Sequence, residues 1–178
     1  MRIAAAVIAA TIAAIIADGP ASQAQTPAPV PEVMPFDIPY GAPLKLDQAD
    51  KAITAAIAEA KKHNWKMSIT VVDPAGNLIA HATMDGTQYA SISISQAKAR
   101  TAATFRRPSG VFQTAVNGGS PNGLSLLAVA GGGVASEGGF PIVIDGKLVG
   151  AIGASGGIFT QDAVTAKAGL AAVTAQAK

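Results

Sequence analysis

The chain has 178 residues, of which 39 are Ala, 19 are Gly and 11 are Pro, whereas aromatic residues make up only 4%. Charged residues make up 13%, and 13 basic against 11 acidic side chains leave a formal net charge of +2. Because this charge is small and scattered along the chain, we expect no nucleic-acid partner. The length and the hydrophobic share of 49% predict one globular domain, and the absence of Cys excludes disulfides, thiolate metal sites and a Cys nucleophile.

The first residues have the layout of a secretory signal peptide. Met1 and Arg2 precede an uncharged, mostly apolar run over residues 3–17, and a small-x-small triplet ends at Ala24. A membrane anchor is the alternative, but this run is shorter than the roughly 20 apolar residues that span a bilayer. We therefore predict that residues 1–24 are removed and that the mature protein is periplasmic or secreted, with no membrane segment after cleavage.

Residues 25–43 are rich in proline, at positions 27, 29, 31, 35, 39 and 43. Proline fixes φ and lacks a backbone donor, so neither a helix nor a sheet can run through this segment. We interpret it as an extended N-terminal arm that is either disordered or lies along a neighbouring subunit. The domain proper is then expected over residues 44–178.

The first half of the domain predicts a helix followed by a hairpin. Residues 46–64 have apolar side chains at helical spacing, with Asp47 as the expected N-cap. Residues 67–72 and 78–84 are typical of strands, and the turn residues of 73–77 lie between them.

Small side chains dominate the middle of the chain. Residues 91–105 predict a closely packed helix, 109–116 a short helix, and 124–129 an apolar element of undetermined type. The segment 130–141 holds five glycines and is a candidate pocket wall, because glycine lets the backbone approach a ligand closely.

The end of the chain predicts a second hairpin and a last helix. Asp145 and Gly146 favour a type I′ turn between strands 141–144 and 147–152. Thr160 is the expected N-cap of an Ala-rich helix that runs to about residue 175. Together the elements predict a single α+β domain with a mainly antiparallel sheet of about five strands flanked by helices.

No phosphate-binding loop, His-Glu-x-x-His or Cys-x-x-Cys motif is present, so the candidates are single residues. His81 shares a strand face with Ile79 and Thr83. Its imidazole could bind haem iron or carry a proton, or it is an ordinary half-exposed strand residue. His63 next to Lys62 is more simply a cation at a helix C-terminus.

Several other residues have both a binding and a packing interpretation. Met84 and Tyr89 could reach a haem or its iron, although Met most often fills gaps in a core. Lys98 and Arg100 could pair with haem propionates or with a substrate carboxylate, or they belong to a solvated helix face. If the protein is an enzyme, Glu137 is a candidate general base.

Four blocks of sequence, at residues 67–86, 90–110, 138–157 and 161–173, resemble the GlcG/HbpS (DUF336) family of haem-binding proteins. The resemblance covers about residues 44–173. It implies an antiparallel sheet flanked by helices, a symmetric homo-oligomer that is often an octamer, and haem as the cofactor. Lys98 and Thr101 match the family pattern and join the candidate cofactor-binding residues, whereas Thr83 stands where relatives often carry a basic residue.

The expected function is therefore that of an exported haem-binding protein, a homo-oligomer that stores, transports or senses haem. His81 is our expected iron ligand, chosen for its chemistry. The alternative is a cofactor-independent lyase or isomerase that acts on a small carboxylated or sugar-like molecule, with Glu137 or Asp162 as base and Lys98 as anion contact. A structural oligomer without a small ligand is the third interpretation.

Overall fold

The structure is a computed structural model that describes residues 30–34, 36–119, 122–129 and 131–175. The predicted signal peptide over residues 1–24 lies outside the described residues, as do residues 25–29 of the predicted arm. None of the helices in the described ranges is long and apolar enough to cross a membrane. The elements in chain order are α1 (Leu46–Lys62), β1 (Ser68–Val72), β2 (Leu78–Thr83), α2 (Ala90–Thr104), α3 (Gly110–Asn117), α4 (Asn122–Val129), β3 (Gly139–Ile144), β4 (Lys147–Ser155) and α5 (Phe159–Thr174).

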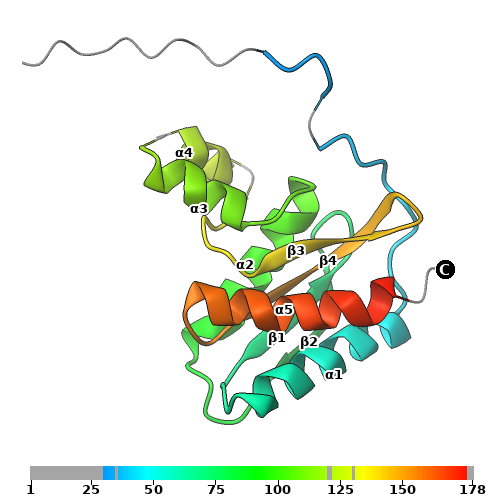
Figure 1. Cartoon of the computed structure of the whole chain (residues 1–178), viewed down its shortest axis with the longest axis vertical. Helices are drawn as coiled ribbons and strands as arrows, with labels where there is room; N and C mark the ends of the chain where they lie inside the picture. Colours follow the sequence, from blue (N-terminus) through cyan, green and yellow to red (C-terminus); the bar gives the residue numbers. More distant parts are fainter. Residues whose placement is uncertain (1–29, 35, 120–121, 130, 176–178) are drawn as a thin grey trace, which may run out of the picture. The chain divides into compact units, whose positions relative to one another are not determined.

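The described strands form one sheet in the order β2-β1-β4-β3, and every neighbouring pair is antiparallel (Figure 1). The predicted α+β fold is confirmed, with four strands in place of about five. The nearest feature to a fifth strand is a single parallel bridge between Tyr40 and Leu148. The two hairpins lie side by side because β1 pairs with β4, so the first and second halves of the chain build one continuous sheet.

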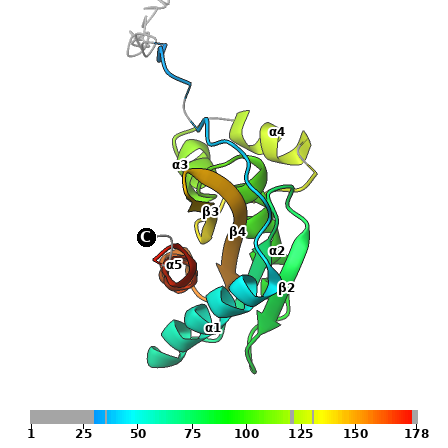
Figure 2. The same cartoon turned by 90° about the vertical axis from the view of Figure 1, so that its right-hand side faces the viewer.

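Helices cover both faces of the sheet, and small residues let them approach closely. Ile69 and Val71 of β1 belong to the core that α1 and α5 cover, whereas Val72 packs with Ala99 and Ala102 of α2 on the other face. Figure 2 shows the sheet between α5 and α2. A Cβ atom at Gly153 would lie 2.3 Å from a backbone oxygen of α2, so only glycine allows this contact.

Residues 36–43 of the proline-rich arm lie on the domain itself, an arrangement that the sequence did not predict. Gly41 N donates to Leu148 O at 2.8 Å, and Leu148 N donates to Pro39 O at 2.8 Å. A guanidinium N–H of Arg106 donates to Ile38 O at 3.0 Å. This part of the arm therefore continues the sheet next to β4, where β1 has already turned away.

The predicted element types agree with the structure, and the differences lie at element ends: β3 begins two residues before the predicted strand 141–144, and β4 runs three residues beyond the predicted strand 147–152. Asp145 and Gly146 have φ angles of 50° and 72°, as the predicted type I′ turn requires. The predicted N-caps Asp47 and Thr160 are wrong, because α1 begins at Leu46 and α5 at Phe159. The undetermined apolar element is part of helix α4.

Candidate functional site

Strands β1 and β2 place hydroxyl groups and one imidazole on the same face of the sheet. Ser68 lies opposite Thr83, and Thr70 lies opposite His81, in the antiparallel register. Because side chains alternate along a strand, these four groups share the face that carries α2. Helix α2 packs on β1, β3 and β4, and His81 on the edge strand β2 is left half-exposed.

Both ring nitrogens of His81 contact hydroxyl groups. Nδ1 lies 2.7 Å from Thr70 Oγ1. Nε2 lies 2.9 Å from Thr83 Oγ1 and 3.4 Å from Ser68 Oγ. Partial burial lowers the pKa of His81 below its usual value. The ring is therefore neutral at pH 7, and neutral imidazole is the form that binds metal ions.

An open cavity of about 340 Å³ lies at the end of β2, where Thr83, the hydroxyl neighbour of His81, lines it together with residues on the α1 side of the sheet. Ile57 and Met84 give the cavity an apolar surface, Lys61 and Lys66 add two ammonium groups, and Asp85 adds one carboxylate. Met84 also packs against the core between α1 and the sheet. The cavity thus combines apolar contact, a thioether and an excess of one positive charge at the end of β2.

Lys98 is not available to an outside anion, because it forms a buried ion pair. Its Nζ atom donates to Asp162 Oδ2 at 2.6 Å, and the two side chains are 2% and 4% exposed. Burial raises the pKa of Asp162, while the Lys98 ammonium and the N–H of Gly157 favour its charged form. Lys98 is therefore not free to act as an anion contact, and Asp162 is not free to act as a general base, because each is bonded to the other.

Gly138 leaves the space that this ion pair needs. A Cβ atom there would lie 3.1 Å from Lys98 Nζ and 2.9 Å from Asp162 Cβ, and the φ angle of 121° also favours glycine. The glycine-rich segment before β3 therefore allows one side chain of α2 and one of α5 to meet, although the two helices lie on opposite faces of the sheet.

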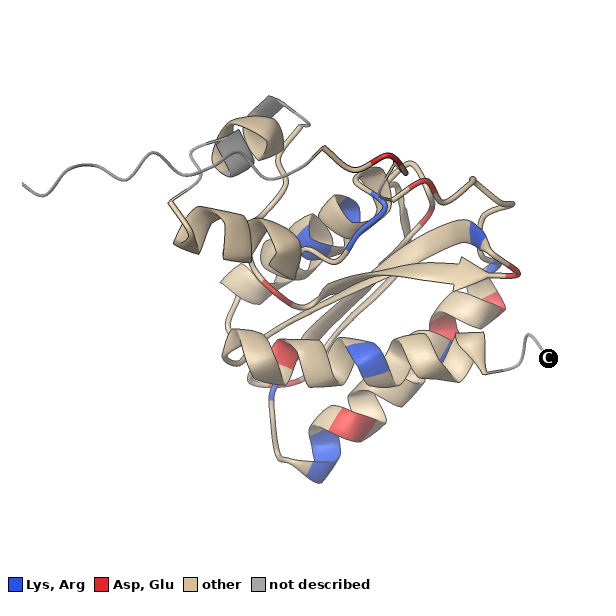
Figure 3. Ribbon diagram, turned by 45° about the horizontal axis from the view of Figure 1, so that its top comes forward, with Lys and Arg blue, Asp and Glu red and all other residues tan. Residues whose placement is uncertain are grey.

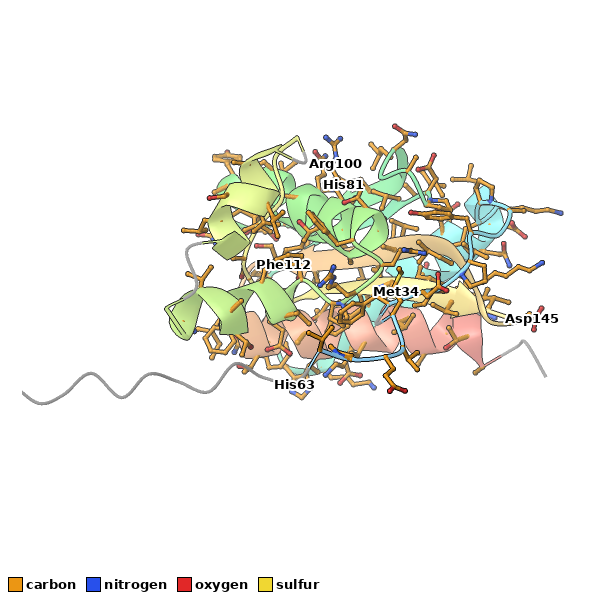
Figure 4. All side chains as sticks on the ribbon, turned by 90° about the horizontal axis from the view of Figure 1, so that it is seen from above. Met34, His63, His81, Arg100, Phe112 and Asp145 are labelled. Carbon is orange, nitrogen blue, oxygen red and sulfur yellow. The ribbon has the colours of Figure 1, made fainter. Side chains whose placement is uncertain are left out.

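The remaining candidates on α2 do not converge on one point. Thr101 is buried, donates to Ala97 O at 2.7 Å and accepts from Val134 N at 2.9 Å. Tyr89 is 92% exposed. Arg100 lines a separate cavity of about 180 Å³ with Gly132. Figure 4 shows Arg100 and His81 on the α2 side of the sheet, whereas His63 lies on the opposite side.

Glu137 lies in a third place, a cavity of about 490 Å³ that Phe140 and Phe159 also line. Its backbone N–H donates to Gln113 Oε1 at 2.7 Å. Nearby, residues 153–157 fit the Gly-x-Ser-x-Gly pattern of a hydrolase nucleophile. Ser155 is buried and its hydroxyl donates to Ser91 Oγ at 3.4 Å, so this serine is not exposed as a nucleophile would be.

His81 and Met84 thus lie close together in the chain, one before and one after Thr83 at the end of β2. The structure separates both from the other candidates, which are Lys98, Thr101, Arg100 and Glu137. Sequence reasoning missed Lys61 and Lys66, which the basic run of residues 61–66 could have indicated. No three His, Asp or Glu side chains of the described ranges gather as a metal site. A single imidazole among hydroxyl groups suits a metal that brings its other ligands with it.

Comparison with known families decides what kind of protein this is. The model of the family described as "Haem degrading protein HbpS-like" matches residues 44–171. The chain belongs to the HbpS-like family. The resemblance predicted from the four sequence blocks is confirmed, and the match begins directly after the arm, at the first residue of the predicted domain.

Two curated relatives are similar over most of their own length. Protein GlcG of Escherichia coli K12 is 41% identical over 112 residues, which are 63% of this chain and 81% of GlcG. An uncharacterized 15.0 kDa protein in the dhaT-dhaS intergenic region of Citrobacter freundii is 34% identical over 135 residues, 72% of this chain and 91% of that protein.

Solved structures of the HbpS-like fold superpose on nearly their full length. The DUF336 protein ORFY of Klebsiella pneumoniae has a TM-score of 0.70 and 26% identity, over 83% of this chain and 99% of ORFY. A PduOC:heme complex has a TM-score of 0.68 and 25% identity, over 74% and 95%. A double mutant of Streptomyces reticuli HbpS has a TM-score of 0.67 and 28% identity, over 82% and 97%.

Proposed function

We propose that this HbpS-like protein binds haem at the edge of β2 and in the cavity beside it. The observation that carries the proposal is the neutral imidazole of His81, half-exposed on an edge strand and bonded to Thr83, which lines a cavity with two ammonium groups and one carboxylate. The PduOC:heme complex, which has the same fold, supports the choice of haem.

The side chains present fit the chemistry of haem. Nε2 of His81 would bind the haem iron as an axial ligand. Ile57 and Met84 would contact the apolar ring, and Lys61 and Lys66 would pair with the propionates. These two lysines replace Lys98, which was the expected anion contact and is buried against Asp162.

In the cell, we propose an exported protein that forms a homo-oligomer and stores, transports or senses haem. The layout of residues 1–24 supports export to the periplasm or beyond. The open shape of the cavity supports an assembly, because a second subunit on the exposed edge of β2 would enclose the ligand. An octamer is the assembly that the family resemblance implies.

The alternative of a lyase or isomerase keeps one supporting observation. Glu137 lines the cavity of about 490 Å³, where a carboxylate could take a proton from a small ligand. The other two residues of that hypothesis, Lys98 and Asp162, are bonded to each other. Haem binding therefore has more support from the described side chains.

The two histidines of the chain provide the test and its control. The purified protein is titrated with hemin and the Soret band is followed, for the unchanged chain, His81→Ala and His63→Ala. His63 stacks on Trp65 with ring centroids 4.3 Å apart, lies 3.2 Å from Glu59 Oε1 and is not among the residues that line the cavity.

We expect saturable binding at micromolar hemin, a loss of about tenfold or more in affinity for His81→Ala, and no change for His63→Ala. Absence of a saturable Soret shift in the unchanged chain would refute haem binding. A normal shift in His81→Ala would leave haem binding in place and refute the iron ligand.

A further inference from the structure

We infer that Ser95 and Thr70 hold the proton of His81 on Nδ1, so that the lone pair of Nε2 faces the exposed hydroxyl of Thr83 on the edge strand β2. Ser95 and Thr70 are then positioning residues, since they act on a ligand through the imidazole. The tautomer follows from the hydrogen bonds alone, whereas its use in iron binding rests on the proposed function.

The order of the hydrogen bonds is set at a backbone carbonyl. Ser95 Oγ lies 2.9 Å from Ile92 O, one turn earlier in α2. A carbonyl oxygen can only accept, and a serine hydroxyl has a single hydrogen to donate. Ser95 therefore spends its hydrogen on Ile92 O, and its own oxygen is left as an acceptor.

Thr70 must then donate toward Ser95. The two hydroxyl oxygens lie 2.9 Å apart and both side chains are fully buried, so one hydrogen has to lie between them. Because the hydrogen of Ser95 is already used, it comes from Thr70. Thr70 Oγ1 then accepts from the other side, where His81 Nδ1 lies at 2.7 Å. Nδ1 therefore carries the proton of the neutral ring.

The hydroxyl groups on the other side of the ring complete the same order. With Nε2 unprotonated, Thr83 donates to it over 2.9 Å, and Ser68 donates to Thr83 over 2.9 Å. The contact between Ser68 and Ser95 is longer, at 3.5 Å, and does not compete. In this series of hydrogen bonds, the hydroxyl groups of Ser95, Thr70, Thr83 and Ser68 thus each donate one hydrogen bond.

The reverse order fails at its inner end. If Thr70 donated to Nδ1, Ser95 would have to donate to Thr70, and its oxygen would face Ile92 O at 2.9 Å with no hydrogen between them. Two acceptors at that distance repel each other, and the site is too buried for water to relieve them. The carbonyl of Ile92 therefore fixes the tautomer of a ring on a different element.

This arrangement suits a metal ligand. A ligating histidine usually donates its second ring N–H to a fixed acceptor, which sets the ring orientation and raises the basicity of the ligating nitrogen. Here the acceptor Thr70 is buried, whereas Thr83 beside Nε2 is exposed. An iron atom would need to displace the exposed Thr83 hydroxyl from Nε2, whereas the buried Ser68 hydroxyl is more distant from Nε2, at 3.4 Å.

The test reads the tautomer directly in the haem-free protein. The ¹⁵N resonances of His81 are measured by NMR above the ordinary imidazole pKa of about 6.5. We expect a pyrrole-type signal for Nδ1 and a pyridine-type signal for Nε2. In Thr70→Val the acceptor is gone, and we expect the proton on Nε2, where Thr83 can accept it. In Ser95→Ala we expect a mixture of the two tautomers.

Ser93→Ala is the matched control, because Ser93 makes the same kind of bond on α2, to Ala90 O at 3.1 Å, but is exposed and outside the network. Its His81 signals should equal those of the unchanged chain. A pyrrole-type Nε2 in the unchanged chain overturns the inference whatever hemin does, and it needs no variant to fold. A protonated Nδ1 without hemin binding would instead refute the proposed function and leave the tautomer standing.

Discussion

The ammonium group of Lys98 lies 2.6 Å from a carboxylate oxygen of Asp162, and this ion pair joins helices on opposite faces of the sheet. Lys98 belongs to α2 and Asp162 to the first turn of α5, 64 residues later. The carboxylate also accepts from Gly157 N at 3.0 Å, so it caps the start of α5. One buried charge pair thus fixes the helix layers relative to the sheet.

Removal of one partner should therefore destabilise the domain strongly. Lys98→Met leaves the buried carboxylate of Asp162 without its cation, and we expect a loss of about 3–5 kcal/mol in the free energy of unfolding. Arg100→Met, two positions further on the exposed face of α2, should change it by less than about 0.5 kcal/mol. Urea denaturation of the two variants checks this. Equal midpoints would show that the ion pair is not structural.

The cavity beside β2 predicts a second contrast, between neighbouring lysines. Lys61 and Lys66 line it, whereas Lys62 bonds Glu59 at 2.6 Å. Figure 3 shows that charges of both signs are interspersed along α1, so the contrast depends on position and not on net charge. Lys61→Gln and Lys66→Gln should each weaken hemin binding by about two- to fivefold, as expected for exposed ion pairs.

Lys62→Gln, which removes the same charge, is the control for those two variants and should bind hemin normally. Titrations at low and high salt separate the effects further, because salt screens exposed charges. If all three substitutions weaken binding equally, the lysines act through net charge and the cavity is not the propionate site.

Local sequence signals predicted most of the fold and little of the site. Asp145 and Gly146 predict their turn because these two residue types readily adopt the positive φ angles that it requires. Lys98, in contrast, looked like a surface cation because its partner lies 64 residues away. A partner at that distance depends on the sheet order, and a single sequence does not contain it.

For the same reason, the sequence does not predict the hydrogen-bond network around His81. The alternation of Ser68, Thr70 and Val72 predicts a shared face within β1, but the register that puts Thr70 opposite His81 depends on the turn between the strands. The bond from Ser95 to Ile92 O requires, in addition, that α2 cross this face. Only the assembled layers bring the carbonyl, the two hydroxyls and the imidazole into line.

Acid should destabilise the protein partly through His81. Burial holds its pKa in the folded state below the ordinary value of 6.5, so the unfolded chain binds the proton more tightly. The free energy of unfolding therefore has its full value with respect to His81 above pH 6.5. It decreases as the pH falls below 6.5 toward the lower pKa of the folded state. His81→Gln lacks this group, so its stability should fall less over the same range.

Denaturation midpoints of both proteins between about pH 7.5 and pH 5 check the sign. His63 is present in both chains, and its contribution cancels in the difference. A steeper loss on acidification in His81→Gln than in the unchanged chain would mean that the folded state favours the protonated imidazole, which contradicts a ring held neutral by burial.

The last prediction concerns the arm, which two neighbouring arginines hold on the domain. Arg106 donates to Ile38 O at 3.0 Å, and its guanidinium carbon lies 5.5 Å from the centre of the Tyr40 ring. Arg107 lies 4.2 Å from the centre of the Phe36 ring. A hydrogen bond from a charged donor and a cation–π contact each stabilise by about 1–2 kcal/mol at partly buried positions.

Arg106→Ala should therefore release the arm while the sheet remains folded. We expect the rate of proteolysis within residues 36–43 to rise about tenfold, because a loss of about 1.4 kcal/mol increases the open population by that factor when the arm opens and closes rapidly. Arg100→Ala, which removes an exposed arginine of α2 that makes none of the arm contacts described above, should leave the rate unchanged. Mass spectrometry of the fragments locates the cuts. Equal rates in both variants would show that the bridge between Tyr40 and Leu148 holds the arm without Arg106.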